Sequence, residues 1–190
     1  MISAILLAAG QSRRMLGDNK LLKTFKNKYL INHILGTLIK SKVNKIIVVL
    51  GFQNLKVRKI MLKNKKIKCI YNKNYRSGMA SSIKSGLKKI SIKNKGFLIV
   101  QADMPHISKK VINSLYAAII NKNKEIFVPI YKKRFGNPVG FKRSMIKPLY
   151  KVKNDRGAKE IIKQNKKKLH FIKVNSHSIF KDFNTKKDFE

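Results

Sequence analysis

Short continuous apolar runs recur along the chain, and most of them end in a small residue or a turn. The clearest runs span residues 2–9, 45–50 and 96–101, and they are rich in Ile, Leu and Val. Such runs are typical of strands that are buried on both faces. Further strands are predicted at residues 67–71, 125–130 and 169–174.

Between these strands, apolar residues recur at helical spacing. In the segment 29–39 they occupy positions 30, 31, 34, 35, 38 and 39, which form one face of a helix. Further helices are predicted at residues 54–62, 78–90, 108–120 and 154–166. Strands that alternate with helices predict parallel βαβ units, and therefore an α/β fold with one doubly wound, mostly parallel sheet and helices on both faces.

Length and composition fit a single domain over residues 1–190, because 190 residues with 43% hydrophobic content can bury one sizeable core. No apolar run approaches the roughly 18 residues of a membrane span. Cys69 is the only cysteine, which excludes an intramolecular disulfide and suits a reducing cytoplasm. The 45 Lys and Arg against 8 Asp and Glu give a net charge of +37, so anionic partners are expected.

The segment that follows the first strand has the composition of a phosphate-binding loop. Small residues end the strand at Gly10, and Arg14 and Lys20 follow within ten positions. Small residues allow backbone N–H groups to approach an anion closely, and the two cations would neutralise the remaining charge. The alternative interpretation is a buried strand followed by a solvated basic loop, and the spacing alone leaves both open.

Asp103 is the only carboxylate between Asp18 and Glu125, and it follows the predicted strand 96–101 directly. Ligands in open α/β sheets lie beyond the carboxyl ends of the strands, so Asp103 and the first loop are expected at one edge. If the first loop binds phosphate, a Mg²⁺ ion beside that phosphate would need a carboxylate, which makes Asp103 the first choice for a metal ligand. A structural salt bridge is the alternative role.

The residues Leu7-Ala8-Ala9-Gly10-x-Ser12-x-Arg14-Met15, with Lys20 behind them, resemble the N-terminal signature of MobA-like nucleotidyltransferases. The Ala-Ala-Gly form resembles the molybdenum cofactor cytidylyltransferases of that family, which join CTP to molybdopterin. Four later stretches follow in the family's order, at residues 72–82, 103–105, 136–139 and 182–185. Together these motifs extend over most of the chain, and they are more specific for the family than for the substrate.

The resemblance implies a nucleotide-diphospho-sugar transferase-like Rossmann fold, a cytoplasmic enzyme and Mg²⁺ as cofactor. It implies transfer of CMP from CTP to the phosphate of molybdopterin, with a molybdenum hydroxylase or its chaperone as a further partner. The nucleotide-binding residues implied are Leu7, Ala8, Ala9, Gly10, Ser12, Gly78 and Ser82. The catalytic residues implied are Arg14, Lys20 and Asp103, and the metal ligands are Asp103 with either Asp182 or Asn184, of which position favours Asn184.

Some positions depart from the family pattern or allow a structural role. Leu16 replaces a Gly after Met15, Asn137 replaces a His, and Lys186 replaces a Pro. Ser77 or Ser81 could simply cap the helix 78–90, Thr185 could begin a capped helix, and His106 is interpreted as a loop residue.

Other functions remain as alternatives. They are cytidylyl or guanylyl transfer to another phosphorylated acceptor, guanylyl transfer to molybdopterin, or, in a different class, nucleic-acid binding. Nucleic acid is not expected as a partner, because the chain lacks an aromatic stacking series and a recognised binding module.

Overall fold

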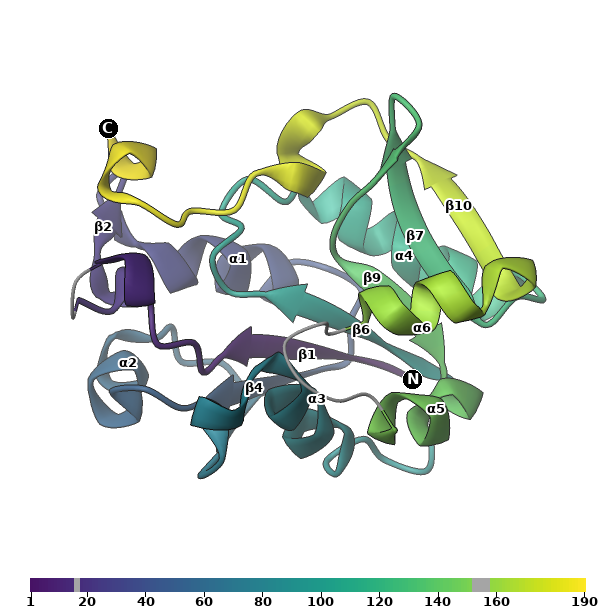
Figure 1. The fold of residues 1–190 in the computed structure, drawn as a ribbon, viewed down its shortest axis with the longest axis horizontal. Coiled ribbons are helices and arrows are strands. Elements are labelled where there is room, and N and C mark those ends of the chain that lie inside the picture. Colours follow the sequence, from purple (N-terminus) through teal and green to yellow (C-terminus); the bar gives the residue numbers. More distant parts are fainter. Residues whose placement is uncertain (16–17, 152–157) are drawn as a thin grey trace.

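The computed structural model describes residues 1–15, 18–151 and 158–190, and within them an eight-stranded sheet forms the centre of the molecule (Figure 1). The strand order is β10-β7-β9-β6-β1-β4-β5, and β8 pairs with β7 at its tip. The strands are β1 (Ile2–Ala8), β4 (Lys45–Leu50), β5 (Ile67–Tyr71), β6 (Gly96–Gln101), β7 (Ile126–Tyr131), β8 (Arg134–Phe135), β9 (Val139–Lys142) and β10 (Leu169–Lys173). A separate ribbon pairs β2 (Thr24–Phe25) with β3 (Lys28–Tyr29).

The sheet is mostly parallel, which confirms the predicted fold class. β1 pairs in parallel with β4 and β6, β4 with β5, and β7 with β10. The exceptions are β9, which runs antiparallel between β6 and β7, and the short β8. In the middle of the sheet, Ile5 lies opposite Ile47 on one side and Ile99 on the other. All three are buried, as the apolar runs in the sequence indicate.

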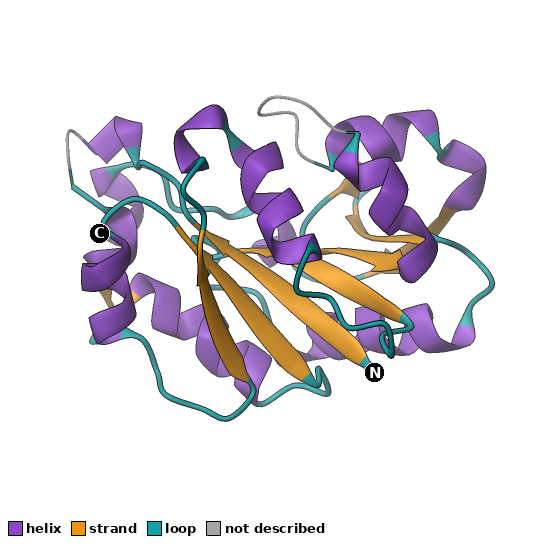
Figure 2. Ribbon diagram, turned by 90° about the horizontal axis from the view of Figure 1, so that it is seen from below, coloured by secondary structure: helices purple, strands orange, loops and turns teal. Residues whose placement is uncertain are grey.

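Helices cover both faces of the sheet (Figure 2). On one face, α1 (Leu30–Ile39), α2 (Asn54–Ile60) and α4 (Lys109–Asn121) pack in a hydrophobic cluster with Ala4 and Leu6 of β1. On the other face, α3 (Met79–Leu87), α5 (Ile146–Tyr150) and α6 (Lys159–Gln164) pack in a cluster with Ile5 of the same strand. Successive side chains of a strand point to opposite faces, so β1 contributes to both cores.

Helix α4 illustrates why the predicted helices form where they do. Its buried residues recur at helical spacing, and the hydroxyl of Ser108 accepts a hydrogen bond from the backbone N–H of Val111 at 3.3 Å. This is the N-cap that the sequence predicts. Helix α3 ends at Leu87, three residues before its predicted end, because Lys89 and Ile90 continue only as a tight turn bonded to Gly86 and Leu87.

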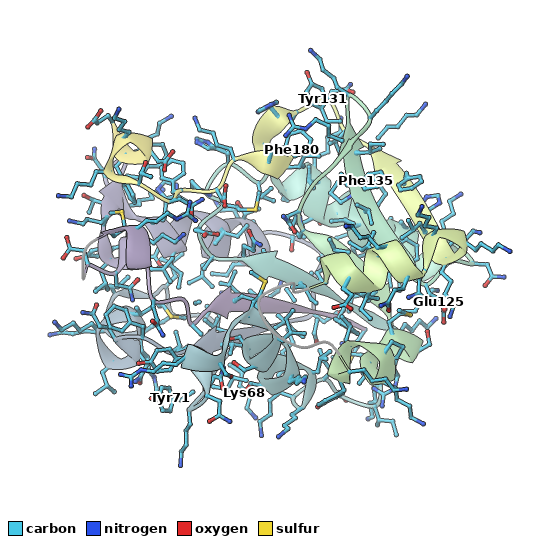
Figure 3. The ribbon with its side chains drawn as sticks, viewed as in Figure 1. Lys68, Tyr71, Glu125, Tyr131, Phe135 and Phe180 are labelled. Atoms are coloured by element: carbon cyan, nitrogen blue, oxygen red, sulfur yellow. The ribbon has the colours of Figure 1, made fainter. Side chains whose placement is uncertain are left out.

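Because the central strands are parallel, β1, β4 and β6 end at the same edge of the sheet. The chain after Phe180 crosses this edge on its way to the C-terminus (yellow in Figure 1), and the N–H of Phe183 bonds to the carbonyl of Asp103 at 2.9 Å. Upstream, the ring of Phe180 lies against Tyr131 and beneath the guanidinium of Arg134 (Figure 3). The C-terminal segment is therefore anchored at both ends of the crossing.

Among the described residues, the longest apolar helices fall short of what a bilayer crossing requires.

Candidate active site

A cavity of about 430 Å³ opens at the carboxyl edge of the sheet. Its walls come from the loop after β1, the start of α3, the loop after β6 and the C-terminal segment. All eleven residues that the sequence analysis assigns to the site line it: Leu7, Ala8, Ala9, Gly10, Ser12, Arg14, Lys20, Gly78, Ser82, Asp103 and Asn184. The structure therefore brings these residues together, while their roles toward ligands remain predictions.

The loop after β1 is shaped by hydrogen bonds from its own side chains. Ser12 has a positive φ of 51°, and its hydroxyl accepts a hydrogen bond from the N–H of Lys20 at 3.1 Å. Asn19 is buried, and its side chain bonds to the N–H of Leu21 and to the carbonyl of Phe52. These contacts close the loop on itself and fix where the side chain of Lys20 begins. Asn19 was not predicted as a site residue, and its place directly before Lys20 was the available signal.

Two glycines beside this loop have different surroundings. A Cβ on Gly10 would meet nothing within 4 Å, so the open space of the cavity lies next to this backbone. A Cβ on Gly51, at the end of β4, would lie 2.7 Å from the carbonyl oxygen of Ala9 and 2.6 Å from the Cβ of Tyr75. Gly51 is therefore needed for the loop to pack on β4, and Gly10 leaves room for a ligand.

The ammonium group of Lys20 lies at the centre of a cluster of oxygen atoms. It donates to Oδ2 of Asp103 at 2.5 Å, to the backbone carbonyl of Phe183 at 2.8 Å and to Oδ1 of Asn184 at 3.0 Å. The two charged side chains are 15% and 18% exposed, respectively, so this ion pair is largely shielded from water. Asp103 thus takes part in a salt bridge, and it also lines the cavity as predicted.

Asn184 and Asp182 were alternatives for the second metal ligand, and their orientations differ. The Asn184 amide nitrogen donates to Oδ2 of Asp182 at 2.7 Å, which turns its oxygen inward toward Lys20 and the Asp103 side of the cluster. Asp182 thus orients Asn184. Behind them, Asp188 accepts hydrogen bonds from the N–H groups of Asn184 and Thr185, and these bonds hold the pKa of Asp188 below its ordinary value. The capped turn predicted at Thr185 is confirmed, and it supports the site.

The oxygen atoms of this cluster suit a hard divalent cation. Oδ1 of Asp103 is buried and has no hydrogen-bond partner among the described residues, and an amide oxygen and a backbone carbonyl lie nearby. The described part of the chain holds no group of three or more His, Cys, Asp or Glu side chains that could bind a metal by themselves. Mg²⁺ is commonly bound by one or two carboxylates together with substrate phosphates and water, so this sparse donor set fits it.

The start of α3 forms another wall of the cavity. Gly78, with φ at 99°, occupies the N-cap position, and no described side chain caps this helix, so the alternative role of Ser77 or Ser81 as its cap is wrong. The hydroxyl of Ser81 instead donates to the carbonyl of Gly78. Ser82 is only 5% exposed and accepts a hydrogen bond from the Asn72 amide at 3.1 Å, so most of its surface contacts protein.

Asp182, the alternative second metal ligand, also lines the cavity, and the lining residues that were not predicted are Gln11, Leu21, Tyr75, Arg76, Met79, Gln101 and Ala102. The guanidinium of Arg76 lies 5.8 Å from the centre of the Tyr75 ring, so a cation and an aromatic ring stand together at the rim. Both residues lie inside a stretch that carries the family resemblance, and this was the available signal.

Two other residues named in the sequence analysis, His106 and Asn137, do not line the cavity. His106 packs between Phe25 and Phe183 outside the cavity lining, and burial lowers its pKa, which favours the neutral ring at pH 7. The N–H of Asn137 bonds to the carbonyl of Ile179. Leu16, Gly17 and the predicted helix start at residues 154–157 fall outside the described residues.

This chain belongs to the family of MobA-like NTP transferase domains, which it matches over residues 4–169. Two curated relatives are named probable molybdenum cofactor guanylyltransferase, from two strains of Clostridium perfringens. They are 32% and 33% identical over 133 and 132 residues. Each match covers 70% of this chain and 61% of the relative, so the chain spans less than two thirds of those proteins.

Solved structures share the fold over almost the whole chain. Rv0371c of Mycobacterium tuberculosis H37Rv superposes with a TM-score of 0.87 at 20% identity, covering 99% of this chain and 95% of that one. Its homologue from Mycobacterium sp. strain JC1 gives 0.86 at 23% identity, covering 99% and 92%. A nucleotidyl transfer enzyme from Methanothermobacter gives 0.83 at 16% identity, covering 100% and 94%.

Proposed function

We propose that this protein transfers CMP from CTP to the phosphate of molybdopterin and releases pyrophosphate. The observation that carries this proposal is that a small-residue loop, two cations and a buried carboxylate oxygen with no partner in the described part of the chain line one cavity. The loop leaves its backbone accessible at Gly10, and Arg14 and Lys20 supply positive charge for a triphosphate. The test is pyrophosphate release with CTP and molybdopterin as substrates.

In this proposal, the protein accelerates the reaction by positioning and charge neutralisation. The phosphate of the acceptor attacks the α-phosphorus in line, and the bond from that phosphorus to the bridging oxygen of pyrophosphate breaks. The acceptor phosphate is already anionic near neutral pH, so no general base is needed. Arg14 and Lys20 would stabilise the charge that develops on the phosphoryl oxygens.

Asp103 and Asn184 would hold Mg²⁺ beside the triphosphate, where the ion would neutralise charge on the phosphate oxygens. The partnerless Oδ1 of Asp103 supports this assignment, because a buried carboxylate oxygen is costly unless something contacts it. One related structure, Rv0371c of Mycobacterium tuberculosis at a TM-score of 0.82 and 19% identity, is described as a complex with manganese.

The nucleotide base is the finer part of the proposal. The Ala9-Gly10 pair favours CTP, because members of the family that use GTP tend to carry Gly-Gly there. The names of the Clostridium relatives favour GTP as a second candidate. Ala9 lines the cavity but is only 4% exposed, and its methyl faces the position of Gly51. The methyl therefore acts on the cavity mainly by setting how closely the loop packs.

We expect kcat/KM for CTP to exceed that for GTP by about 10- to 200-fold, the range for discrimination by a methyl-sized volume. Because most of the Ala9 methyl is covered, the effect of Ala9→Gly should fall near the lower limit, narrowing the preference by about 10-fold. Ala80→Gly is the matched control, since Ala80 packs in the same cluster outside the cavity lining and should leave the ratio unchanged. If the parent enzyme prefers GTP, the nucleotide substrate is GTP and not CTP.

Lys20→Ala should weaken binding of Mg²⁺-CTP and slow transfer, whereas Lys65→Ala should do neither. Lys20 lies in the cavity, and Lys65 lies in an exposed turn, so the pair separates a specific contact from the general field of +37. Isothermal titration calorimetry measures the difference. Equal losses at both positions would mean that the overall charge, rather than a site, binds the nucleotide.

The alternative class, nucleic-acid binding, is tested by salt. Lysine and arginine residues are scattered over every segment of the sequence, and nitrogen-tipped side chains project on all sides of the outline in Figure 3, which argues against a dedicated nucleic-acid surface. Binding of nucleic acid would fall steeply as ionic strength rises, and binding of Mg²⁺-CTP would depend on the metal.

A thermal-shift screen with Mg²⁺ and each nucleotide adds a direct readout of nucleotide binding. A ligand at 100 times its dissociation constant adds about 2.7 kcal/mol to the free energy of unfolding.

A further inference from the structure

The ammonium group of Lys20 has all of its hydrogen-bonding capacity used within the protein. An ammonium has three N–H donors. Asp103, Phe183 and Asn184 each provide one oxygen acceptor within 3.0 Å. These oxygens belong to the same cluster that the proposed function assigns to Mg²⁺. A lysine is thus bound where a divalent cation is expected.

We propose that Lys20 is a resident cation that holds this oxygen cluster together in the free protein and must leave it before a divalent metal ion binds. The inference rests on the proposed function, because it takes Asp103 and Asn184 as the metal ligands. It assigns Lys20 a positioning role in addition to contact with phosphate. It also makes the metal and the nucleotide bind with positive coupling.

A divalent cation and the Lys20 ammonium exclude one another at Asp103. Oδ2 of Asp103 lies 2.5 Å from the lysine nitrogen, and the pair is largely shielded from water. A divalent cation at this carboxylate would stand beside the ammonium, and charges of like sign repel strongly where water is excluded. Metal binding to the free protein must therefore include the cost of displacing Lys20.

Lys20 also has a role in the free protein, where it contacts one oxygen from each residue of the cluster. The oxygens come from two segments that are far apart in the sequence. Asp103 lies 83 positions after Lys20, and Asn184 lies 164 positions after it. Without a cation between them, a carboxylate, an amide oxygen and a carbonyl would face one another unpaired, which is unfavourable. Lys20 therefore keeps the C-terminal segment and the loop after β6 in register before any ligand arrives.

The displaced ammonium of Lys20 can move into the cavity. The backbone of Lys20 is fixed by Ser12, and the neighbouring Leu21 is buried, so the loop itself stays in place. The four-carbon side chain is flexible, and the cavity that it lines would hold the triphosphate. Phosphate oxygens offer the displaced ammonium new acceptors. The nucleotide thus makes room for the metal, and by linkage the metal favours the nucleotide equally.

The test is a titration of Mn²⁺ alone against the protein without nucleotide, with free Mn²⁺ followed by its electron paramagnetic resonance signal. Lys20→Met keeps the length of the side chain and removes its charge, and it should bind Mn²⁺ about 10-fold more tightly than the parent, within the usual range for coupling between sites. Lys23→Met is the matched control, since Lys23 pairs with the exposed Asp18 and should leave Mn²⁺ affinity unchanged. Lys20→Met combined with Asp103→Asn should lose the gain. A Lys20→Met protein that binds Mn²⁺ no more tightly than the parent would overturn the inference.

A second measurement uses the unaltered chain, in case Lys20→Met does not fold. Brief acetylation followed by mass spectrometry reports the reactivity of each lysine. Lys20 should react more slowly than the exposed Lys65 in the free protein, and its reactivity should rise when Mn²⁺ is added without nucleotide. Equal reactivity of the two lysines in the free protein would contradict the inference. Because neither readout uses CTP or molybdopterin, a failed transfer assay would remove the proposed substrates and leave this result standing.

Discussion

Asp103→Asn should reduce Mg²⁺-dependent pyrophosphate release by about 10²-fold or more while leaving the fold intact. The amide keeps the shape of the side chain and one oxygen for Lys20, but it removes the negative charge that would hold the metal. The partnerless Oδ1 of Asp103 is the atom whose loss matters most. Initial rates with CTP and molybdopterin, together with the thermal unfolding midpoint, measure the two effects separately.

Glu125→Gln is the matched control for this variant. Glu125 is also a paired carboxylate, with Lys168 at 2.6 Å, but it precedes β7 and so lies toward the opposite edge of the sheet (Figure 3). Its loss should leave turnover unchanged, because its ion pair is partly exposed and contributes little. Turnover of Asp103→Asn within a few-fold of the parent would remove Asp103 from the site.

Gly51→Ala should lower the free energy of unfolding by about 1 to 3 kcal/mol, the usual cost of overpacking a buried site. The new Cβ would lie 2.7 Å from the Ala9 carbonyl oxygen and 2.8 Å from the Ala9 Cβ, so the loop after β1 would have to shift. Urea unfolding measures the loss, and nucleotide affinity should fall with it. An unchanged unfolding midpoint would mean that the loop can move away without cost.

Gly10→Ala provides the contrast within the same loop. Its Cβ would project into open space, so stability should change by less than about 0.5 kcal/mol, as for ordinary surface substitutions. Affinity for Mg²⁺-CTP should still fall, because the methyl would stand where backbone approaches phosphate. A Gly10→Ala protein that binds the nucleotide normally would place the phosphates elsewhere in the cavity.

The local patterns of the sequence predict most of this fold. Apolar runs identify the buried strands, helical spacing identifies α1 and α4, and Ser108 marks the start of α4. The short ribbon of β2 and β3, the hairpin strand β8 and helix α5 were not predicted. Elements of this length are determined by turn geometry and by tertiary packing, and they leave little periodic signal.

For the site, the sequence predicts which residues line the cavity, but it does not predict the hydrogen bonds and the salt bridge among them. The parallel topology places Lys20 and Asp103 at one edge, and the cavity contains both. The salt bridge between them, the orientation of Asn184 by Asp182 and the buried Asn19 all depend on contacts between distant segments. No local pattern records such contacts. The alternative role of Ser77 or Ser81 as a helix cap is wrong for the same reason. The Ser81 hydroxyl instead forms hydrogen bonds with the Asn72 amide and the Gly78 carbonyl.

The crossing of the C-terminal segment has a consequence for the order in which the protein matures. Phe183 and Asn184 supply two of the oxygens around Lys20, although the family match ends at residue 169. During synthesis these residues emerge after every strand of the sheet, and contacts this distant in sequence form slowly. The strands of the sheet can therefore pair in the nascent chain while the cavity still lacks one wall, because Ile179 and Phe183 join the hydrophobic core only when this segment packs. Competence to bind ligand therefore requires that residues 183 and 184 have been synthesised and have packed across the edge of the sheet.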